Sequence, residues 1–564
     1  MCRFRFTVGI LALAFTSVPG AATPPNIVVI MSDDQDYGST LTRMLNVRSY
    51  MMAQGVTFPN NFAVNPVCCA SRSTFLTGQY SHNDDVWTND PDGPRGGGWI
   101  SFQPHESNTL AVWLHNAGYR TSMIGKYLNG YSMNDPEIPP GWDDWRVLIE
   151  PYVYYYWGYK MNENGTLVSY GTDDPSYQTD VISNKAVAFI ESMKNSSQPF
   201  FLEITGIAPH VGGSGRVPGN NSYPVPPPRW DGYYSGLPLP HPPSFNEADF
   251  SDKPQFMQDN VPLLDQAGID SVTTSFRKRA ETLRGVDDMV KAVLDELSSS
   301  GKLNSTYIMY VSDNGYFQGE HRLPQGKYLD YDESIRVPLI IRGPGVAANI
   351  VKTQFTSNVD LTATILDWAG ARAGNPQDGQ SLRPLLSNRN PIWRTAFLIE
   401  GADMLPFFGG GGLYGYYSGI RTADYVYVEH TKRDDGSPMG TELYNLGADP
   451  YEINSIQIVN GNTIDRRYQS ALRTLKRELA ALRTCVSTAC FITSGQPTRI
   501  RTRSADSDTG PASKTKLNVD WTITGDPYEN NYTEEERRVI YTKAHGYDLP
   551  KHNQQSTDDH IGPN

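Results

Sequence analysis

The sequence is poor in cysteine, has no excess of positive charge and contains no long apolar run after its first residues. Five cysteines among 564 residues exclude a small scaffold held together by disulfides. The formal net charge of −13 argues against a nucleic-acid partner, because nucleic-acid-binding proteins present positive surfaces. No stretch after residue 22 has the roughly 20 apolar residues that a membrane-spanning helix needs, so we expect no membrane association.

Residues 1–22 have the pattern of a secretory signal peptide. Arg3 and Arg5 precede the apolar run Phe6–Phe15, and small residues follow at Gly20–Ala22. We therefore expect a secreted protein, and its Asn-x-Ser/Thr sequons are expected to carry N-glycans. These sequons are Asn164, Asn195, Asn220, Asn304 and Asn531.

The cysteines beyond the predicted signal peptide form two close pairs. Cys485 and Cys490 are expected to form a small disulfide loop in an oxidising compartment. Cys68 and Cys69 are adjacent, and a bond between neighbouring cysteines would close a strained ring. Two apparently unpaired thiols in a secreted protein call for a chemical explanation.

Apolar, β-branched runs alternate with helical patterns in the first two thirds of the chain. An ordinary composition, 38% hydrophobic and 19% charged, is typical of a folded protein. Residues 280–297 have the spacing of a buried helix. Alternation of this kind predicts an α/β fold with a mostly parallel sheet between helices. The predicted strands are residues 26–31, 199–205, 306–311 and 337–341.

The pattern changes near residue 396. Residues 425–429 and 442–445 predict a small antiparallel sheet, and residues 466–482 predict a helix. The Pro- and aromatic-rich stretch 217–245 predicts a long surface loop. We therefore divide the chain into a signal peptide (1–22), a catalytic domain (23–395), a C-terminal subdomain (396–493) and a polar extension (494–564).

Two of the predicted strands end in acidic and amide side chains. Asp33 and Asp34 follow the first strand, and Asp313 and Asn314 follow another. Ligands of parallel sheets bind beyond the carboxyl ends of the strands, so these tips are expected to converge. Carboxylate and amide oxygens suit Ca²⁺ or Mg²⁺, although such residues are also common in turns and at helix N-caps.

Residues 68–78, CCASRSTFLTG, resemble the signature of the sulfatase family. In that family the first cysteine, here Cys68, is oxidised to formylglycine by the formylglycine-generating enzyme. Cys69 fills a variable place, and Ala70 stands where proline is commoner. Without this context, a buried free thiol would be the ordinary role of Cys68.

Formylglycine explains why the signature needs a modified cysteine. Its hydrate carries two hydroxyl groups on one carbon. One hydroxyl attacks sulfur and expels the alcohol, and the other then loses its proton while the carbonyl reforms and sulfate departs. An unmodified thiol or a serine hydroxyl has no second hydroxyl for that last step.

The resemblance continues over residues 24–455 and implies the remaining site residues. Asp33, Asp34, Asp313 and Asn314, together with modified Cys68, match the family's metal ligands, and calcium is the commoner ion, with magnesium as the alternative. Such an ion would neutralise sulfate charge.

The basic residues implied by the resemblance hold the sulfate. Arg72 matches the arginine that orients the formylglycine hydrate, and Lys126, in Gly-Lys-Tyr-Leu-Asn-Gly, matches a sulfate-binding lysine. His210, in Ala-Pro-His, and Lys327 match residues that contact substrate, and either can protonate the leaving alcohol. Asn129 stands near where many members have a histidine and is a candidate substrate-binding residue.

Two further histidines are expected near this site. His82 follows the signature and is expected to line the cleft. His321 precedes Lys327 and is expected to lie behind the residues that touch substrate.

The resemblance implies an alkaline-phosphatase-like α/β fold with a smaller C-terminal antiparallel sheet. It also implies a secreted sulfatase acting on a small-molecule or glycan sulfate ester, with arylsulfatase-type activity as the assay-level description. The alternatives are an N-acetylglucosamine-6-sulfatase, a phosphate or phosphonate ester hydrolase of the same superfamily, and a noncatalytic sulfoglycan-binding protein.

Overall fold

The computed structural model describes residues 24–132, 136–213, 215–216, 223–387, 389–405, 412–459, 461–463 and 465–493. The predicted signal peptide and the predicted polar extension lie outside the described residues, as do the sequons at Asn220 and Asn531. Residues 223–245 form turns and irregular structure, which agrees with the predicted surface loop.

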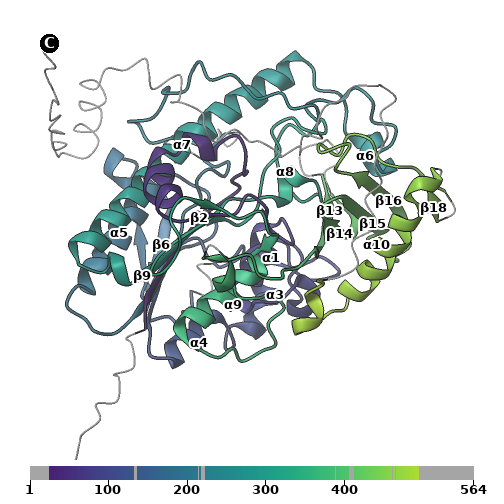
Figure 1. The fold of residues 1–564 in the computed structure, drawn as a ribbon. Coiled ribbons are helices and arrows are strands. Elements are labelled where there is room, and N and C mark those ends of the chain that lie inside the picture. Colours follow the sequence, from purple (N-terminus) through teal and green to yellow (C-terminus); the bar gives the residue numbers. More distant parts are fainter. Residues whose placement is uncertain are drawn as a thin grey trace, which may run out of the picture.

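A ten-stranded mixed sheet forms the centre of the molecule (Figure 1). Its five middle strands are parallel, and antiparallel strands flank them on both sides. All four strands predicted from the sequence are present, as β1, β8, β9 and β10. In spatial order the strands are β11 (Ile350–Val351), β2 (Val56–Thr57), β10 (Leu339–Arg342), β9 (Thr306–Ser312), β1 (Asn26–Ser32), β8 (Phe200–Thr205), β4 (Arg120–Gly125), β5 (Asp144–Leu148), β6 (Lys160–Glu163) and β7 (Thr166–Ser169).

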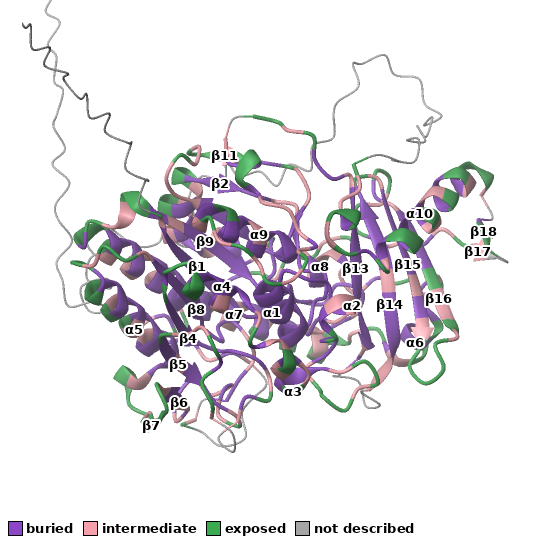
Figure 2. Ribbon diagram, turned by 90° about the horizontal axis from the view of Figure 1, so that it is seen from below, coloured by how far each residue is buried: buried purple, intermediate pink, exposed green. Residues whose placement is uncertain are grey.

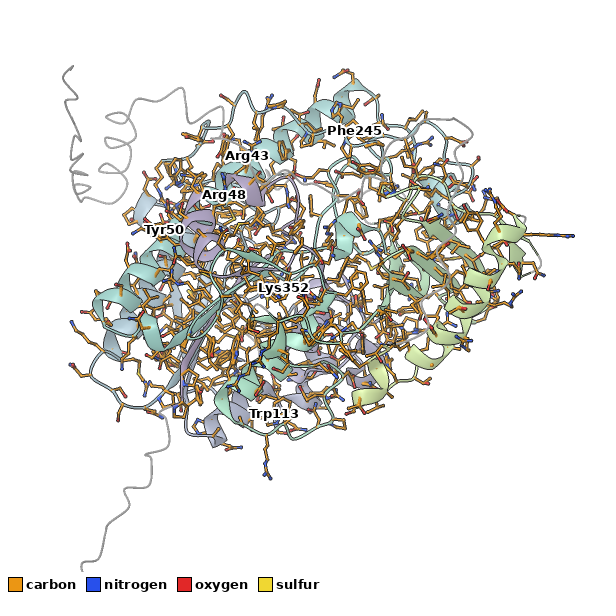
Figure 3. All side chains as sticks on the ribbon, viewed as in Figure 1. Arg43, Arg48, Tyr50, Trp113, Phe245 and Lys352 are labelled. Atoms are coloured by element: carbon orange, nitrogen blue, oxygen red, sulfur yellow. A yellow bond between two sulfur atoms is a disulfide. The ribbon has the colours of Figure 1, made fainter. Side chains whose placement is uncertain are left out.

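Helices cover both faces of this sheet (Figure 1). The α-helices of the described residues are α1 (Cys68–Thr77), α2 (Ser81–Asp84), α3 (Gly98–Phe102), α4 (Leu110–Asn116), α5 (Gln178–Ser192), α6 (Gln255–Asn260), α7 (Gln266–Ser299), α8 (Asp332–Ile335), α9 (Asn358–Ala369) and α10 (Gln469–Leu482). Successive residues of a strand point to opposite faces, so β1 contributes Val28 and Ile30 to one core and Ile27 and Val29 to the other. The first core contains α5 and α7, and the second contains α1, α4 and α9, including Trp113 (Figure 3). Because β1 is buried on both faces, its residues Ile27–Met31 are all apolar, and the strand is easy to predict from the sequence.

Helix α7 is longer than the sequence predicted. It begins at Gln266 rather than at residue 280, and the Asp265 side chain caps it by accepting a hydrogen bond of 2.8 Å from the Gly268 amide. Apolar periodicity is weak in its first turns, which lie near the surface, so the pattern marked only the later, core-facing part.

A four-stranded antiparallel sheet forms the C-terminal part (Figure 2). Its strands, in order, are β13 (Ala396–Met404), β14 (Leu413–Thr422), β15 (Tyr425–Lys432) and β16 (Pro438–Asn445). Helix α10 packs on one face through Leu472, Leu475 and Leu479. The other face shares a core with Phe62 and Ile335 of the larger part, so the two parts form one continuous structure.

The remaining strands form two small two-stranded sheets. These are β3 (Asn61–Phe62) with β12 (Thr356–Ser357), and β17 (Ile458–Val459) with β18 (Asn462–Thr463).

A disulfide joins Cys485 to Cys490 just beyond α10, whereas Cys68 and Cys69 are free and buried. Among the described residues, no helix combines the length and the apolar character that crossing a bilayer requires.

Candidate active site

The tips of four adjacent parallel strands meet at one place. Asp33 and Asp34 follow β1, and Asp313 follows its neighbour β9. On the other side of β1, the loop after β8 carries His210, and Lys126 follows β4. The predicted convergence of the strand tips is therefore present, and it places carboxylates and basic groups side by side.

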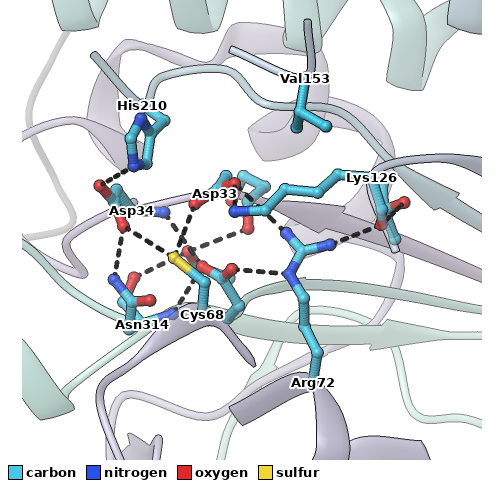
Figure 4. Close-up of polar contacts among 12 residues, drawn as sticks. Asp33, Asp34, Cys68, Arg72, Lys126, Val153, His210 and Asn314 are labelled. Carbon is cyan, nitrogen blue, oxygen red and sulfur yellow. Dashed lines mark hydrogen bonds and ion pairs between the residues drawn. The ribbon is translucent and has the colours of Figure 1, made fainter. Parts of the chain in front are cut away.

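Cys68 is the first residue of α1 and points into this cluster (Figure 4). Its Sγ lies 3.5 Å from Asp33 Oδ1, 3.9 Å from Asp34 Oδ1 and 3.1 Å from Lys327 Nζ. The helix ends at Gly78, whose φ of 70° is left-handed and therefore favours glycine. The signature thus forms a buried helix whose first turn places Cys68 in the cluster and whose C-cap is Gly78.

The oxygen donors around Cys68 fit a hard divalent cation. Asp33 and Asp34 are fully buried beside Asp313 and Asn314. The Asn314 amide donates 2.7 Å to Asp34 Oδ1, while its own Oδ1 is buried and has no hydrogen-bond partner among the described residues. An orphaned amide oxygen among three carboxylates is the arrangement expected of a Ca²⁺ or Mg²⁺ ligand set.

Two lysines hold these carboxylates in their charged form. Burial alone raises the pKa of Asp33 and Asp34, but Lys126 beside Asp33 and Lys327 beside Asp34 bring both pKa values below the ordinary value. Burial alone would lower the pKa of each lysine, yet the same carboxylates raise it well above the ordinary value. Burial and the Asp33 charge raise the pKa of the Cys68 thiol to about 12, so the unmodified thiol is protonated and a poor nucleophile.

Arg72 binds the carboxylate of Asp313 and the main chain at Lys126, and no hydrogen bond between Arg72 and Cys68 is present. It lies one turn after Cys68 on α1, and its Nε donates 2.9 Å to Asp313 Oδ2. Its Nη1 donates 2.8 Å to the carbonyl of Lys126, whose Nζ lies 2.5 Å from Asp33 Oδ2. Arg72 therefore links the tips of β9 and β4 across the signature helix.

His210 stands at the more exposed side of the site. Its Nδ1 lies 2.6 Å from the carbonyl of Val211, which can only accept, so the Nδ1 hydrogen points there. Its Nε2 then faces the cluster, 3.5 Å from Asp34 Oδ2. The imidazole ring stacks on Tyr154 at a centroid distance of 4.4 Å.

Asn129 lies at the edge of the site rather than against Cys68. Its Nδ2 donates 2.7 Å to the hydroxyl of Tyr154. The ring of Tyr154 in turn lies 4.9 Å from Lys126 Nζ. Asn129 is therefore connected to Lys126 through Tyr154.

The structure places His82 and His321 in contacts outside this cluster. His82 bonds Glu400 of β13 at 3.0 Å and the carbonyl of Cys485 at 3.0 Å. It therefore ties the larger part of the molecule to the C-terminal part, and the expectation that it lines the cleft is wrong. His321 bonds Glu247 at 3.2 Å and stacks on Tyr331 at 4.1 Å, behind the site.

Arg279 of α7 is a site residue that sequence reasoning missed. It is fully buried, donates to the carbonyl of Asp34 and donates 3.3 Å to the carbonyl of Pro209, next to His210. Its guanidinium stacks 3.8 Å above the ring of Tyr316. The sequence does indicate a role for Arg279, because it lies on the apolar stripe of the helix. Arginine is rarely buried unless it forms an ion pair or a hydrogen bond.

The fold is an alkaline-phosphatase-like α/β architecture, and its site brings together carboxylates that could hold a divalent cation and buried lysines that could hold an anion. The family model for sulfatases matches residues 25–371, and a model described as N-sulphoglucosamine sulphohydrolase, C-terminal, matches residues 319–484. The chain belongs to the sulfatase family, whose members hydrolyse sulfate esters.

Curated relatives agree with this membership. An extracellular sulfatase SULF-1 homolog of Drosophila melanogaster is 36% identical over 386 residues, 67% of this chain and 33% of that protein. An N-acetylglucosamine-6-sulfatase of Capra hircus is 31% identical over 77% of this chain and 80% of that protein. An arylsulfatase of Volvox carteri is 37% identical over 65% of this chain and 59% of that protein. The chain thus spans about a third of the first relative's length and four fifths of the second's.

Solved structures share the fold. One, solved in complex with its substrate D-glucosamine-2-N,6-O-disulfate, has a TM-score of 0.62 at 24% identity and covers 81% of this chain and 97% of its own. A phosphonate monoester hydrolase of Agrobacterium radiobacter has a TM-score of 0.57 at 19% identity and covers 81% and 95%. At these identities the likeness establishes the architecture alone.

Proposed function

We propose that this sulfatase cleaves sulfate esters with a formylglycine derived from Cys68, beside a divalent cation held by Asp33, Asp34, Asp313 and Asn314. The observation that carries the proposal is the position of Cys68 Sγ, which lies within 4 Å of Asp33, Asp34 and Lys327 at once. The hydrate of formylglycine would supply a nucleophilic hydroxyl there, and the cation, Ca²⁺ or alternatively Mg²⁺, would supply charge for the sulfate oxygens.

Lys126 and Lys327 flank the point of attack. Lys126 lies on the Asp33 side and Lys327 on the Asp34 side, and both side chains are almost fully buried. Buried ammonium groups bind anionic oxygens more strongly than exposed ones, because little water competes. The two lysines therefore receive the sulfate group from either side of Cys68.

The same geometry separates the roles of His210 and Lys327. His210 keeps its hydrogen on Nδ1, so its Nε2 lone pair faces the site and can accept a proton. Lys327 Nζ is a hydrogen-bond donor 3.1 Å from Cys68 Sγ. We therefore assign Lys327 as the donor toward the leaving oxygen and His210 as the group that accepts a substrate or water proton.

For the substrate, we propose a 6-sulfated N-acetylglucosamine unit of a glycan, with aryl sulfates as assay substrates. The goat and human relatives named N-acetylglucosamine-6-sulfatase, which this chain matches over 80% and 88% of their length, support the sugar. The half-buried Asn129, beside Tyr154, offers a side-chain amide for hydrogen bonds with a sugar ring.

Paired kinetics would test this assignment. Protein produced together with a formylglycine-generating enzyme should release sulfate from N-acetylglucosamine-6-sulfate with a higher kcat/KM than from p-nitrophenyl sulfate. A reversed order would make the protein an arylsulfatase, and faster turnover of a phenylphosphonate monoester would make it a phosphonate hydrolase. Binding of sulfated glycan with no turnover of any ester would leave only a binding protein.

We also propose that the protein is secreted and N-glycosylated. Asn164, Asn195 and Asn304 are exposed in the structure, as glycan acceptors must be. Expression in a eukaryotic host should yield protein in the medium whose mass falls after treatment with an N-glycosidase. Retention of all the protein inside the cells would contradict the proposal.

A further inference from the structure

A second buried polar cluster lies where the antiparallel sheet meets the chain just after Lys327. It consists of Asp330, Asp403 of β13, His430 of β15 and Glu442 of β16, and each residue is at most 2% exposed. None of these residues contacts Cys68, and the sulfatase chemistry does not use them.

His430 is the centre of this cluster. Its Nδ1 lies 3.0 Å from Asp403 Oδ1, and its Nε2 lies 3.1 Å from Glu442 Oε1. One ligand atom each from Asp330, His430 and Glu442 lie within 4.8 Å of one another. The other oxygen of Glu442 accepts hydrogen bonds from the hydroxyls of Tyr331, at 2.9 Å, and Tyr444, so its orientation is fixed.

One oxygen of the Asp330 carboxyl group lacks the partner that a buried polar atom requires. Its Oδ1 is buried and has no hydrogen-bond partner among the described residues. Burial and the charge of Glu442 raise the pKa of Asp330 to about 7, which reflects the cost of placing a second carboxylate here. An unsatisfied buried carboxyl oxygen is costly unless a proton or a cation compensates it.

Within the described residues, no lysine or arginine forms an ion pair with any of the three carboxylates. Within the described part of the chain, the ion pairs of Asp403 and Glu442 are both with His430. The charge of Lys253 acts on Glu442, but Lys253 forms its ion pairs elsewhere, with Glu247 at 3.5 Å and Asp252 at 3.3 Å. The cluster therefore has an excess of negative charge that a bound cation would offset.

We propose that this cluster is a second metal site, distinct from the one at Cys68, that takes Zn²⁺ through Asp330, His430 Nε2 and Glu442. Two carboxylates and one imidazole suit zinc, whereas the oxygen-only set beside Cys68 suits calcium. Asp403 would accept the Nδ1 hydrogen of His430 and so point Nε2 at the ion, the arrangement found behind metal-binding histidines. The metal takes the place of the proton on Nε2.

The site has a structural role. Asp330 lies three residues after Lys327, whereas His430 and Glu442 belong to the antiparallel sheet. Nearby, the hydroxyl of Tyr417 donates 2.9 Å to the carbonyl of Tyr328. A metal bound to Asp330 and the sheet therefore fixes the segment that carries the active-site lysine.

Metal analysis of the full-length protein tests this proposal. Protein expressed in medium containing zinc and calcium, then desalted, should contain about one zinc per chain by plasma mass spectrometry, beside the calcium. His430→Gln should lose the zinc and keep the calcium. The matched control is His82→Gln, because His82 is a partly buried histidine that is also paired with a glutamate of the same sheet, and it should keep both metals.

A second measurement covers the case in which His430→Gln does not fold. Wild-type protein treated with EDTA and returned to excess calcium should gain thermal stability on addition of Zn²⁺, and Co²⁺ should give the visible absorption of a nitrogen- and oxygen-ligated ion. Asp330→Asn, which changes one atom, should abolish both responses. Wild-type protein with less than a tenth of an equivalent of zinc and no response to either ion would overturn the proposal, as would zinc that survives Asp330→Asn.

Discussion

The segment around Lys327 separates two buried clusters of carboxylates that differ in their balance of charge. In the Cys68 cluster, Asp33, Asp34 and Asp313 face three permanent cations, Lys126, Lys327 and Arg72. A divalent cation added there leaves net positive charge, which attracts an anionic sulfate.

In the second cluster, three carboxylates face a single histidine. Asp330, Asp403 and Glu442 share His430, and no lysine or arginine of the described residues pairs with them. A divalent cation bound there would bring the net charge of the cluster close to zero, so the cluster would not attract an anion. The comparison teaches that buried carboxylates alone do not identify a catalytic site, whereas the basic groups around them do.

The largest expected effect comes from removing Cys68. Cys68→Ala should lower kcat/KM for sulfate esters by at least about 10³-fold, because a covalent nucleophile is lost. Cys69→Ala is the matched control, since Cys69 is the neighbouring buried free thiol, and it should stay within about tenfold of wild type. An equal loss of kcat/KM in the two variants would show that activity depends on the packing of the helix rather than on Cys68 itself.

Removing Asp313 should affect the Cys68 cluster alone. Asp313→Ala should lower calcium content and activity together, by about 10²-fold or more in kcat/KM, while the zinc content stays unchanged. Asp287→Asn is the control, because Asp287 is equally buried but caps backbone amides of Asn46 and Val47. Loss of both metals in Asp313→Ala would mean that the two clusters are not independent.

Arg279 should have a smaller, positioning effect. Arg279→Met removes the donors to the carbonyls of Asp34 and Pro209 and should lower kcat about 10–100-fold, with partial recovery in Arg279→Lys. Arg284→Met is the control, because Arg284 is a buried arginine of the same helix that bonds the carbonyl of Arg43. If the variant loses stability but keeps the wild-type kcat, Arg279 has a structural role only.

The smallest effect should come from His82, which forms a partly exposed ion pair with Glu400. Burial alone would lower its pKa, but the hydrogen bond and charge of Glu400 raise it to about 9. A histidine whose folded pKa is raised stabilises the fold fully below its unfolded pKa of about 6.5 and loses that contribution as pH rises through about 9. The melting temperature of wild type should therefore exceed that of His82→Gln by a few degrees at pH 6, and the difference should shrink by pH 9.5. A constant difference would show that packing, not charge, is responsible.

The gathering of the predicted residues around Cys68 could be anticipated because the acidic strand tips are local patterns and the basic residues lie in motifs that resemble those of sulfatases; their roles remain predictions. The strands β1 and β9 are mostly apolar runs followed directly by their polar tips, and the signature occupies one helix, whereas β4, with the sequence RTSMIG, has no such pattern and was not predicted. The parallel order of the strands then brings the tips together without further specification. The exact contacts of Arg72, which bonds Asp313 and the carbonyl of Lys126, depend on side-chain packing that no motif encodes.

The residues that escaped prediction act across long sequence separations. Arg279 bonds main-chain carbonyls, which every residue has, so its partners leave no trace in side-chain identity. The second cluster depends on strand register, because His430 pairs opposite Gly440 while Val428 pairs opposite Glu442, which makes His430 and Glu442 diagonal neighbours. His82 was misplaced because it follows the signature in sequence but turns toward the antiparallel sheet.

Peptide mass spectrometry across Cys68 tests the central claim most directly, on protein made with a formylglycine-generating enzyme and assayed for sulfate release. Conversion of the thiol to an aldehyde lowers the peptide mass by about 18 Da, a change outside the ordinary oxidation products of cysteine. The account predicts this loss, with turnover proportional to the converted fraction. A preparation in which Cys68 is wholly an unmodified thiol and sulfate esters are still hydrolysed at full rate would contradict it.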